Sequence, residues 1–242
     1  MEKIYKHIVV LTGAGISAES GLATFRSSNG LWNNHKVEDV ATIEAFEKNP
    51  EYVHQFYNQM KPELLSARPN LAHFALAKLQ NEYLGKVDII TQNIDTLHEK
   101  AGTKRVYHIH GQINQAVCLN CGHVEETWEE VDTQTHCPHC DTTGMFKPNI
   151  VFFGESLLCM DEVDKLLRQC DLFISVGTSG VVYPAAGFAQ TARYFGAQTL
   201  EFNLENTSNN FLFNRHVYGK CSETLPAFVH KLLTETAQNG EE

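Results

Sequence analysis

The chain has 242 residues, of which 43% are hydrophobic, and its formal net charge at pH 7 is −10. This length fits one large domain or a main domain with a small insert, and the apolar fraction permits a sizeable core. The negative charge argues against direct nucleic-acid binding, which usually requires a broad basic surface. No apolar stretch reaches the ~18 residues needed to cross a bilayer, so we expect no membrane partner.

The N-terminal residues favour a cytoplasmic location. They run directly into an apolar strand and a glycine turn, without the longer apolar segment and small-residue cleavage site of a signal peptide. The seven cysteines are an odd number, which does not suggest a disulfide framework. We expect a cytoplasmic protein that is a monomer or a weak oligomer.

Five short apolar runs are typical of buried parallel strands. They cover residues 7–12, 87–91, 106–110, 172–176 and 199–203. Helical patterns lie between several of them, at 161–170, from Pro69 onward, from Pro184 to Gly196, and near the C-terminus around Leu225. Alternating strands and helices predict a doubly wound α/β sheet.

A glycine turn follows the first strand. Residues 13–18 (GAGISA) fit the pattern G-x-G-x-x-A, in which one glycine permits a tight turn and the next lets a pyrophosphate approach the backbone. Backbone N–H groups at the start of a helix then hold the anion. A tight turn without a ligand gives the same short pattern. A dehydrogenase would also need an acidic residue ending a second strand about 20 residues on. That position falls in the segment LWNNHKVED, which we do not predict to be a strand.

Two cysteine pairs predict a structural zinc site. Cys118 and Cys121 form one C-x-x-C, Cys137 and Cys140 form another, and 15 residues separate the pairs. Four thiolates complete a tetrahedron and leave no position for an activated water, so the metal should stabilise the fold. Four unrelated buried thiols are the plain alternative, and three neighbouring histidines compete as ligands. These are His123, His136 and His139.

Polar residues follow two of the predicted strands. Gln92, Asn93 and Asp95 lie at a carboxyl end, where open α/β sheets bind ligands, although this turn can also be read as a helix-capping loop. His108 and His110 share one face of the strand at 106–110, so either can be a general base on sequence grounds alone.

The string from Gly13 to Arg26 (GAGISAESGLATFR) resembles the first signature of the sirtuin family, including its Phe-Arg ending. Further signatures follow in the order of that family. They are 91–95 (TQNID), 110–111 (HG), the cysteine pairs, 153–155 (FGE), 177–179 (GTS) and 203–205 (NLE). The resemblance covers nearly the whole chain, and residues 29–45 look most similar to bacterial members of the class III branch.

The resemblance implies an NAD-dependent protein-lysine deacylase that forms nicotinamide, O-acyl-ADP-ribose and free lysine, with acylated lysines of proteins as its partners. It favours His110 over His108 as the base, because a glycine follows His110, and adds Asn93 and Asp95 as catalytic residues. The NAD contacts that it implies are a longer set. They are Gly13, Ala14, Gly15, Ala18, Glu19, Thr24, Phe25, Arg26, Trp32, Gln92, Asn93, Ile94, Asp95, Gly177, Thr178, Ser179, Asn203, Leu204, Glu205 and Cys221.

Residues 31–68 and 112–147 break the alternation of strands and helices, so we expect a single catalytic unit over 1–242 with two parts. Residues 1–30, 69–111 and 148–242 form a Rossmann-like NAD-binding domain. A helical insert (31–68) and a zinc module (112–147) form a smaller domain.

The peptide slot implied by the resemblance uses residues 151–155 and the loop 180–183, where an extended substrate can add as a strand. The residues of the first segment are Val151, Phe152, Phe153, Gly154 and Glu155.

The acyl pocket departs from the class III pattern. Ala41 and Tyr57 match, but Met60 stands where that branch has an arginine, and methionine cannot pair with a carboxylate. We therefore expect acetyl and other uncharged acyl groups to be preferred, unless Lys61 reaches the pocket instead. The alternatives are a desuccinylase or demalonylase, a mono-ADP-ribosyltransferase on the same scaffold, and a non-catalytic NAD sensor.

Overall fold

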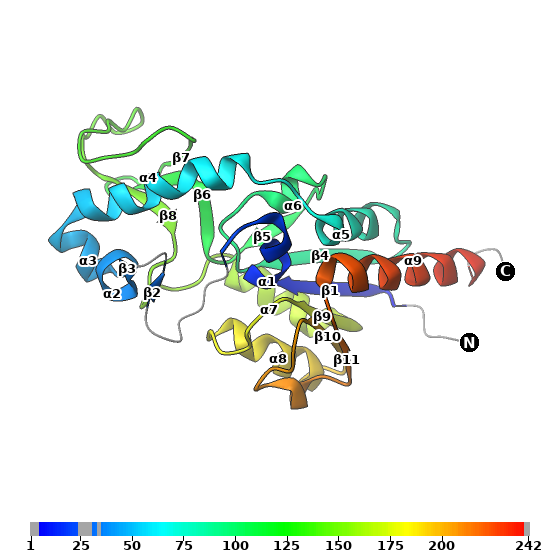
Figure 1. Cartoon of the computed structure of the whole chain (residues 1–242). Coiled ribbons are helices and arrows are strands. Elements are labelled where there is room, and N and C mark those ends of the chain that lie inside the picture. The colour runs from blue at the N-terminus through cyan, green and yellow to red at the C-terminus, as the bar shows by residue number, and fades with distance from the viewer. Residues whose placement is uncertain (1–4, 24–30, 33–34, 240–242) are drawn as a thin grey trace.

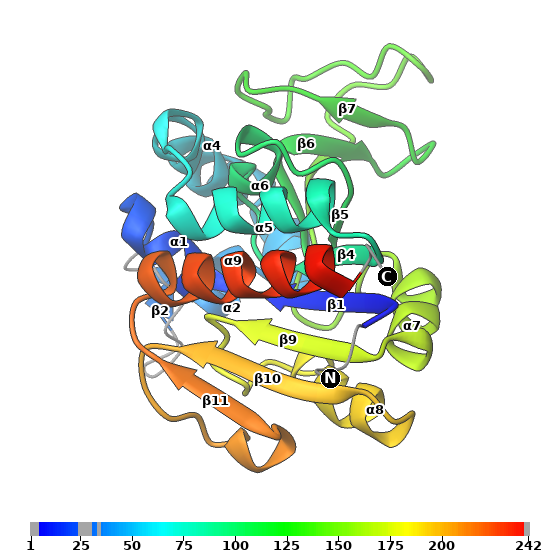
Figure 2. The ribbon, with the colours of Figure 1, turned by 90° about the vertical axis from the view of Figure 1, so that its right-hand side faces the viewer.

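The computed structural model describes the backbone of residues 5–23, 31–32 and 35–239, and the side chains of 5–23 and 35–235. Its centre is a six-stranded parallel sheet in the order β11-β10-β9-β1-β4-β5 (Figures 1 and 2). The strands are β1 (His7–Thr12), β4 (Lys86–Thr91), β5 (Val106–His108), β9 (Leu172–Val176), β10 (Gln198–Asn203) and β11 (Arg215–Tyr218).

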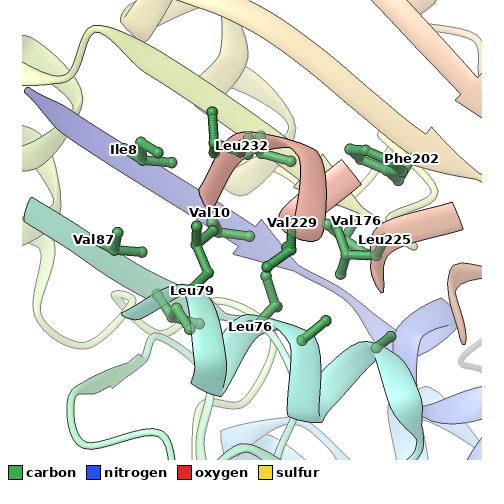
Figure 3. Close-up of a cluster of buried hydrophobic side chains, with 14 of the residues drawn as sticks. Ile8, Val10, Leu76, Leu79, Val87, Val176, Phe202, Leu225, Val229 and Leu232 are labelled. Atoms are coloured by element: carbon green, nitrogen blue, oxygen red, sulfur yellow. The ribbon is translucent and has the colours of Figure 1, made fainter. Parts of the chain in front are cut away.

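Helices cover both faces of this sheet. The helices α5 (Leu71–Glu82) and α9 (Cys221–Asn239) pack on one face, and α7 (Met160–Gln169) and α8 (Phe188–Tyr194) pack on the other (Figure 2). Ile8 and Val10 of β1 face α5 and α9, as Figure 3 shows, while Val9 and Leu11 face α7 and α8. Burial on both faces is why the strands appear in the sequence as unbroken apolar runs. The predicted doubly wound sheet is confirmed.

All five predicted strands exist, with their ends shifted by at most two residues. The largest shift is at β5, which ends at His108 rather than at residue 110. The sixth strand, β11, was not predicted, because its sequence RHVY is largely polar and it lies at the edge of the sheet. The segment after Pro184 begins with a 3-10 turn, η3 (Ala185–Gly187), before α8.

The segment from residue 31 to 68 is mainly helical, as predicted. It contains α2 (Val37–Val40), α3 (Ile43–Lys48) and α4 (Pro50–Ser66). They follow a two-stranded antiparallel ladder that was not predicted, β2 (Leu31–Trp32) with β3 (His35–Lys36). Neither strand joins the parallel sheet, so the second strand of a dehydrogenase pattern does not occur at this point.

The cysteine-bearing segment forms a three-stranded antiparallel sheet in the order β7-β6-β8, which was also not predicted. Its strands are β6 (Gly111–Cys118), β7 (Val124–Glu126) and β8 (Phe146–Ile150). Tyr57 and Met60 of α4 pack in one apolar cluster with Ile113 and Ile150 of this sheet. The helical insert and the cysteine-bearing segment therefore share a core, at the left of Figure 1.

Two lysines fix α4 in place. Lys100, at the end of α6 (Leu97–Lys100), donates from Nζ to the carbonyl oxygens of Leu64, Leu65 and Ala67 at 2.8 to 3.2 Å. These carbonyls end α4, where a cation satisfies unpaired acceptors. Lys61 donates to the carbonyl oxygen of Glu129.

The shorter elements are α1 (Ala14–Ser17), η1 (Ala18–Ser20) and η4 (Asn210–Leu212). Among the described helices, none has the length and apolar character for a membrane span.

Candidate active site

The turn after β1 crosses the turn after β9 at very short range. Gly13 N–H donates to the carbonyl of Val176 at 3.0 Å, and Gly15 N–H donates to that of Gly177 at 2.8 Å. A Cβ on Gly15 would lie 2.7 Å from Gly177 Cα, and Gly177 itself has φ +62°. These glycines are required because two backbones touch. In this structure the absence of a side chain at Gly15 makes room for Gly177, a contact that the sequence pattern did not indicate.

The helix after this turn is short. α1 has four residues and passes directly into the 3-10 turn η1, which places Ala14 and Ala18 in that stretch. An anion bound at this helix start would therefore contact only the few backbone N–H groups of this turn. The expected cofactor residues Thr24, Phe25 and Arg26 lie outside the described residues, and only the backbone of Trp32 is described.

A buried hydrogen-bond network connects the turn after β4 to the glycine turn. Ser17 Oγ donates to Asp95 Oδ2 at 2.9 Å and accepts from Asn93 Nδ2 at 3.1 Å. Asn93 Nδ2 also lies 3.2 Å from the carbonyl oxygen of Gly13, and Asp95 Oδ1 accepts from Leu97 N–H. Burial raises the pKa of Asp95, against the opposing effect of these hydrogen bonds. The structure thus brings Asn93 and Asp95 together on Ser17, a residue that the sequence analysis did not select although it lies inside the glycine motif.

Two further histidines, His73 and His98, lie behind this network, and neither was predicted to belong to the site. His98 Nε2 lies 2.9 Å from Thr12 Oγ1, and the rings of His73 and His98 are 5.2 Å apart. Burial lowers the pKa of His73 to about 4 and that of His98 well below its usual value. Both are therefore neutral at pH 7, and no sequence signal beyond their helical positions marked them.

His110 presents a basic nitrogen at this edge of the sheet. Its Nδ1 lies 2.9 Å from the carbonyl oxygen of Gln92. A carbonyl can only accept, so in the neutral ring Nδ1 carries the proton and Nε2 carries the free lone pair. Burial lowers the pKa of His110, and the bond to Gln92 partly opposes that effect. The half-buried ring is therefore neutral and able to accept a proton at pH 7.

His108 has its nitrogens engaged elsewhere. Its Nε2 lies 2.8 Å from Glu99 Oε1, and its Nδ1 lies 3.3 Å from the carbonyl oxygen of Asn93. The interpretation of His108 as a packed, hydrogen-bonded histidine is confirmed. The two histidines do not share a strand, however, because β5 ends at His108.

The exits of β9 and β10 form the next part of this edge. Asn203 Nδ2 donates to the carbonyl of Thr178 at 2.7 Å, and Thr178 Oγ1 lies 2.9 Å from Ser175 Oγ. Ser179, Leu204 and Glu205 are exposed beside them. The backbone around Asn203 is thus held next to the glycine crossing.

Two expected cofactor residues, Glu19 and Cys221, lie at the start of α9. Glu19 accepts hydrogen bonds from Ser222 N–H at 3.1 Å and Ser222 Oγ at 2.6 Å, so its carboxylate caps the first turn of the helix. Cys221 is buried there, and burial raises the pKa of its thiol to about 11.

The segment 151–155 connects His110 to the helical insert. Val151 N–H donates to the carbonyl of His110 at 3.0 Å, and Phe153 N–H donates to that of Ala41 at 2.8 Å. Phe152 is buried and Phe153 is half exposed. An added peptide strand cannot use the two N–H groups that already bond within the chain.

The expected acyl-pocket residues lie in one buried cluster. Ala41, Tyr57 and Met60 pack with Phe152, whose ring stacks on that of Tyr57 at 5.9 Å and 19°. Burial raises the pKa of Tyr57 far above its usual value, so the phenol remains neutral. Lys61 is directed to Glu129, as described above, so its ammonium does not take the place of the missing arginine.

The four paired cysteines converge as a metal site requires. Their sulfur atoms all lie within 4.8 Å of one another, with Cys118 and Cys140 3.6 Å apart and Cys121 and Cys137 3.8 Å apart. Four sulfurs at the usual ~2.3 Å from a tetrahedral zinc ion are about 3.8 Å from each other. The donor set and its spacing therefore fit one zinc ion.

Known proteins are similar to this chain in sequence and in fold. A model described as the Sir2 family matches residues 13–184. The NAD-dependent protein deacylase SIR2rp3 of Leishmania major is 52% identical over 240 residues, covering 97% of this chain and 98% of that protein. The NAD-dependent protein deacylase of Vibrio cholerae is 47% identical over 239 residues, covering 98% of this chain and 97% of that protein.

Solved structures agree with these matches. A Sir2 homolog–NAD complex has a TM-score of 0.87 at 34% identity, covering 96% of this chain and 91% of that chain. A Sir2–p53 peptide–NAD+ structure has a TM-score of 0.78 at 32% identity, covering 97% and 95%. The family model alone spans well over half of the residues, and the relatives match almost end to end. The chain therefore belongs to the Sir2 family and is a sirtuin of the bacterial type.

Proposed function

We propose that this protein is an NAD-dependent protein-lysine deacylase whose products are nicotinamide, O-acyl-ADP-ribose and free lysine. The observation that carries this proposal is the orientation of His110, whose Nδ1 is held by Gln92 so that Nε2 is the basic atom. The names of the relatives and the NAD and peptide complexes among the structural neighbours support the same activity. NAD is a co-substrate, consumed once for each lysine released.

In the proposed reaction, the acyl oxygen bonds to the ribose carbon while the bond to nicotinamide breaks. His110 Nε2 then removes a proton from a ribose hydroxyl, which attacks the resulting imidate carbon. Water completes the release of lysine and of the acylated ADP-ribose. Asn93 and Asp95 line the nicotinamide and reactive-ribose pocket, with Ser17 fixing both side chains. Gln92 orients the ribose hydroxyls.

The rest of NAD lies, in this proposal, along the glycine crossing and the exits of β9 and β10. Gly13, Gly15 and Gly177 bring the backbone close to the phosphates, and Thr178 and Asn203 flank the adenosine side. The apolar core shared by the helical insert and the cysteine-bearing segment supports the division into a Rossmann-like domain (1–30, 69–111 and 148–242) and a small domain (31–68 and 112–147). The net charge of −10 supports a partner other than nucleic acid. We further propose a cytoplasmic monomer or weak oligomer.

The preferred acyl group is proposed to be uncharged. Met60 offers an apolar surface in the cluster with Tyr57, and Lys61 is committed to Glu129. A carboxylate-tailed acyl group would lack a charge-assisted contact worth ~1.5–3 kcal/mol, roughly a ten- to hundredfold difference. Acetyl and other neutral groups avoid that loss.

The proposed zinc ion is structural. Cys118, Cys121, Cys137 and Cys140 would hold it with four sulfurs, which leaves no coordination position for substrate or water. Its contribution would be to close the ends of β6 and β8, where few apolar side chains are available.

The direct test of the activity combines the protein with NAD and a panel of acyl-lysine peptides, followed by mass spectrometry of every product. We expect acyl loss from the peptide together with O-acyl-ADP-ribose, and a loss of at least about a hundredfold in rate for His110→Ala, because general-base catalysis contributes ~10²–10⁴-fold. ADP-ribose left on protein would instead indicate a transferase. Absence of both products would contradict an enzyme.

The pH dependence should reflect the lowered pKa of His110. Because burial favours the neutral ring, His110 remains a base below the ordinary histidine pKa of ~6.5. We expect kcat/KM to be level above pH 7 and to fall on the acid side with a midpoint below that ordinary value. An acid-side midpoint above 7, in a titration where the fold remains intact, would contradict this assignment.

Removal of the metal should destabilise the fold. Elemental analysis is expected to find one zinc per chain in the wild type and none in Cys137→Ser. Loss of more than ~3 kcal/mol would lower the melting temperature by about 6–12 °C in a chain of this size. Cys159→Ser, at an exposed cysteine outside the cluster, is the matched control and should keep both the metal and the melting temperature. Full zinc content in Cys137→Ser would show that the ligand set is wrong.

Met60→Arg should increase desuccinylation relative to deacetylation by about ten- to hundredfold, since arginine supplies the bidentate donor that methionine lacks. The measurement is kcat/KM on succinyl- and acetyl-lysine versions of one peptide. Met60→Leu keeps the pocket apolar at a similar volume and should leave the ratio unchanged. A folded Met60→Arg protein without any gain on succinyl-lysine would mean that the pocket has been misplaced.

A further inference from the structure

We propose that the ion pair between Lys147 and Glu155 is a positioning device for the acyl-lysine substrate, a buried brace that holds the segment 151–155 between His110 and the helical insert. This inference rests on the proposed deacylase function. It assigns both residues a role behind the wall of the slot, whereas the sequence resemblance placed Glu155 among the residues that contact the peptide.

Lys147 is a cation inside the protein. Its side chain on β8 is 5% exposed, and Nζ donates to Glu155 Oε2 at 3.0 Å and to the carbonyl of Ile150 at 2.8 Å. Nζ also lies 3.9 Å from the centre of the Phe152 ring. A buried ammonium is tolerated because it is paired, hydrogen-bonded and placed over an aromatic face.

Glu155 turns back beneath its own segment. The same oxygen, Oε2, accepts from Phe152 N–H at 2.6 Å, and Glu155 N–H donates to the carbonyl of Phe152 at 3.0 Å. Gly154 between them has φ +93°, which a glycine adopts without strain. The carboxylate therefore joins Lys147 to a tight turn in the backbone.

The braced turn sets the neighbouring contacts. Successive residues of an extended segment point to opposite sides. With Phe152 N–H held by Glu155, the N–H groups of Val151 and Phe153 point the other way and reach the carbonyls of His110 and Ala41. The Phe152 ring fills the cluster that contains Tyr57. The Lys147–Glu155 ion pair thus fixes the positions of three features relative to one another. These are the backbone of His110, the cluster proposed as the acyl pocket, and the segment 151–155.

The residues proposed to hold NAD come mainly from other elements. The glycine crossing, the exit of β4 and the exits of β9 and β10 have hydrogen bonds among themselves that do not involve Lys147 or Glu155. Loss of the brace should therefore weaken binding of the acyl peptide much more than binding of NAD. A general loss of stability would instead lower the fraction of active protein and affect both substrates equally.

The test measures kcat and the KM of each substrate for Lys147→Met, Glu155→Gln, the double variant and Lys147→Arg. Each single change leaves one buried charged or polar group without its partner, so we expect the peptide KM to rise about tenfold while the NAD KM stays within about twofold. The double variant should show a smaller rise than the product of the single effects, because the two residues act as a pair. Lys147→Arg keeps a positive charge beside Glu155, so it should raise the peptide KM less than Lys147→Met does.

Asp88→Asn is the matched control. Asp88 is a buried carboxylate paired with His7, Lys86 and Arg105 at the amino end of the strands, away from the segment 151–155. It should lower the melting temperature without raising the peptide KM. If Lys147→Met does not fold, Glu155→Gln carries the test, because it removes the same pair and leaves Lys147 bonded to Ile150.

Two results would overturn the brace: an unchanged peptide KM in folded single variants, or equal rises of the peptide and NAD KM values. A wild-type protein that does not turn over acyl peptides with NAD would instead refute the proposed function, so the two failures are distinguishable.

Discussion

The close approach of two backbone turns is the constraint on which the site depends. Gly13 and Gly15 lie against Gly177, with N–H groups donated across the crossing at 3.0 and 2.8 Å. A side chain at Gly15 or Gly177 would collide with backbone, which cannot move aside as the end of a flexible side chain can. The crossing joins the carboxyl ends of β1 and β9, the two central strands of the sheet. The chain adds β4 and β5 on one side of this pair and β10 and β11 on the other, and doubly wound folds bind their ligands where the strand order reverses in this way.

Hydrogen bonds connect the proposed catalytic residues to that crossing. Gly13 offers its carbonyl to Asn93, and Ser17, one turn later, holds Asn93 and Asp95 together. His110 leaves the neighbouring strand at the same edge with one nitrogen fixed by Gln92. Hydrogen bonds thus hold Asn93, Asp95 and His110, so these groups are oriented before the substrate arrives. The helical insert contributes the apolar cluster that is proposed as the acyl pocket.

Much of this could be predicted from the sequence, for physical reasons that differ between elements. Parallel strands buried on both faces appear as apolar runs, so β1, β4 and β9 were found, whereas the polar edge strand β11 was not. The cysteine pairs predicted a converging cluster because few other patterns have that spacing. Sequence could not show that Gly15 lies against Gly177, that Ser17 connects two catalytic candidates, or that Lys61 is directed to Glu129. Each of those depends on a long-range contact between segments that carry no local sign of it.

The KM for NAD of Gly15→Ala, measured in the deacylation reaction beside that of Gly187→Ala, tests most directly whether the glycine crossing organises the site. A Cβ at Gly15 would lie 2.7 Å from backbone atoms of Gly177, whereas one at Gly187 has its nearest neighbour at 3.9 Å. Overpacking that costs ~1–3 kcal/mol at the crossing should raise this KM by about tenfold or more, or abolish turnover, while Gly187→Ala behaves as the wild type. A Gly15→Ala protein with an unchanged KM for NAD would contradict the claim that this crossing organises the site.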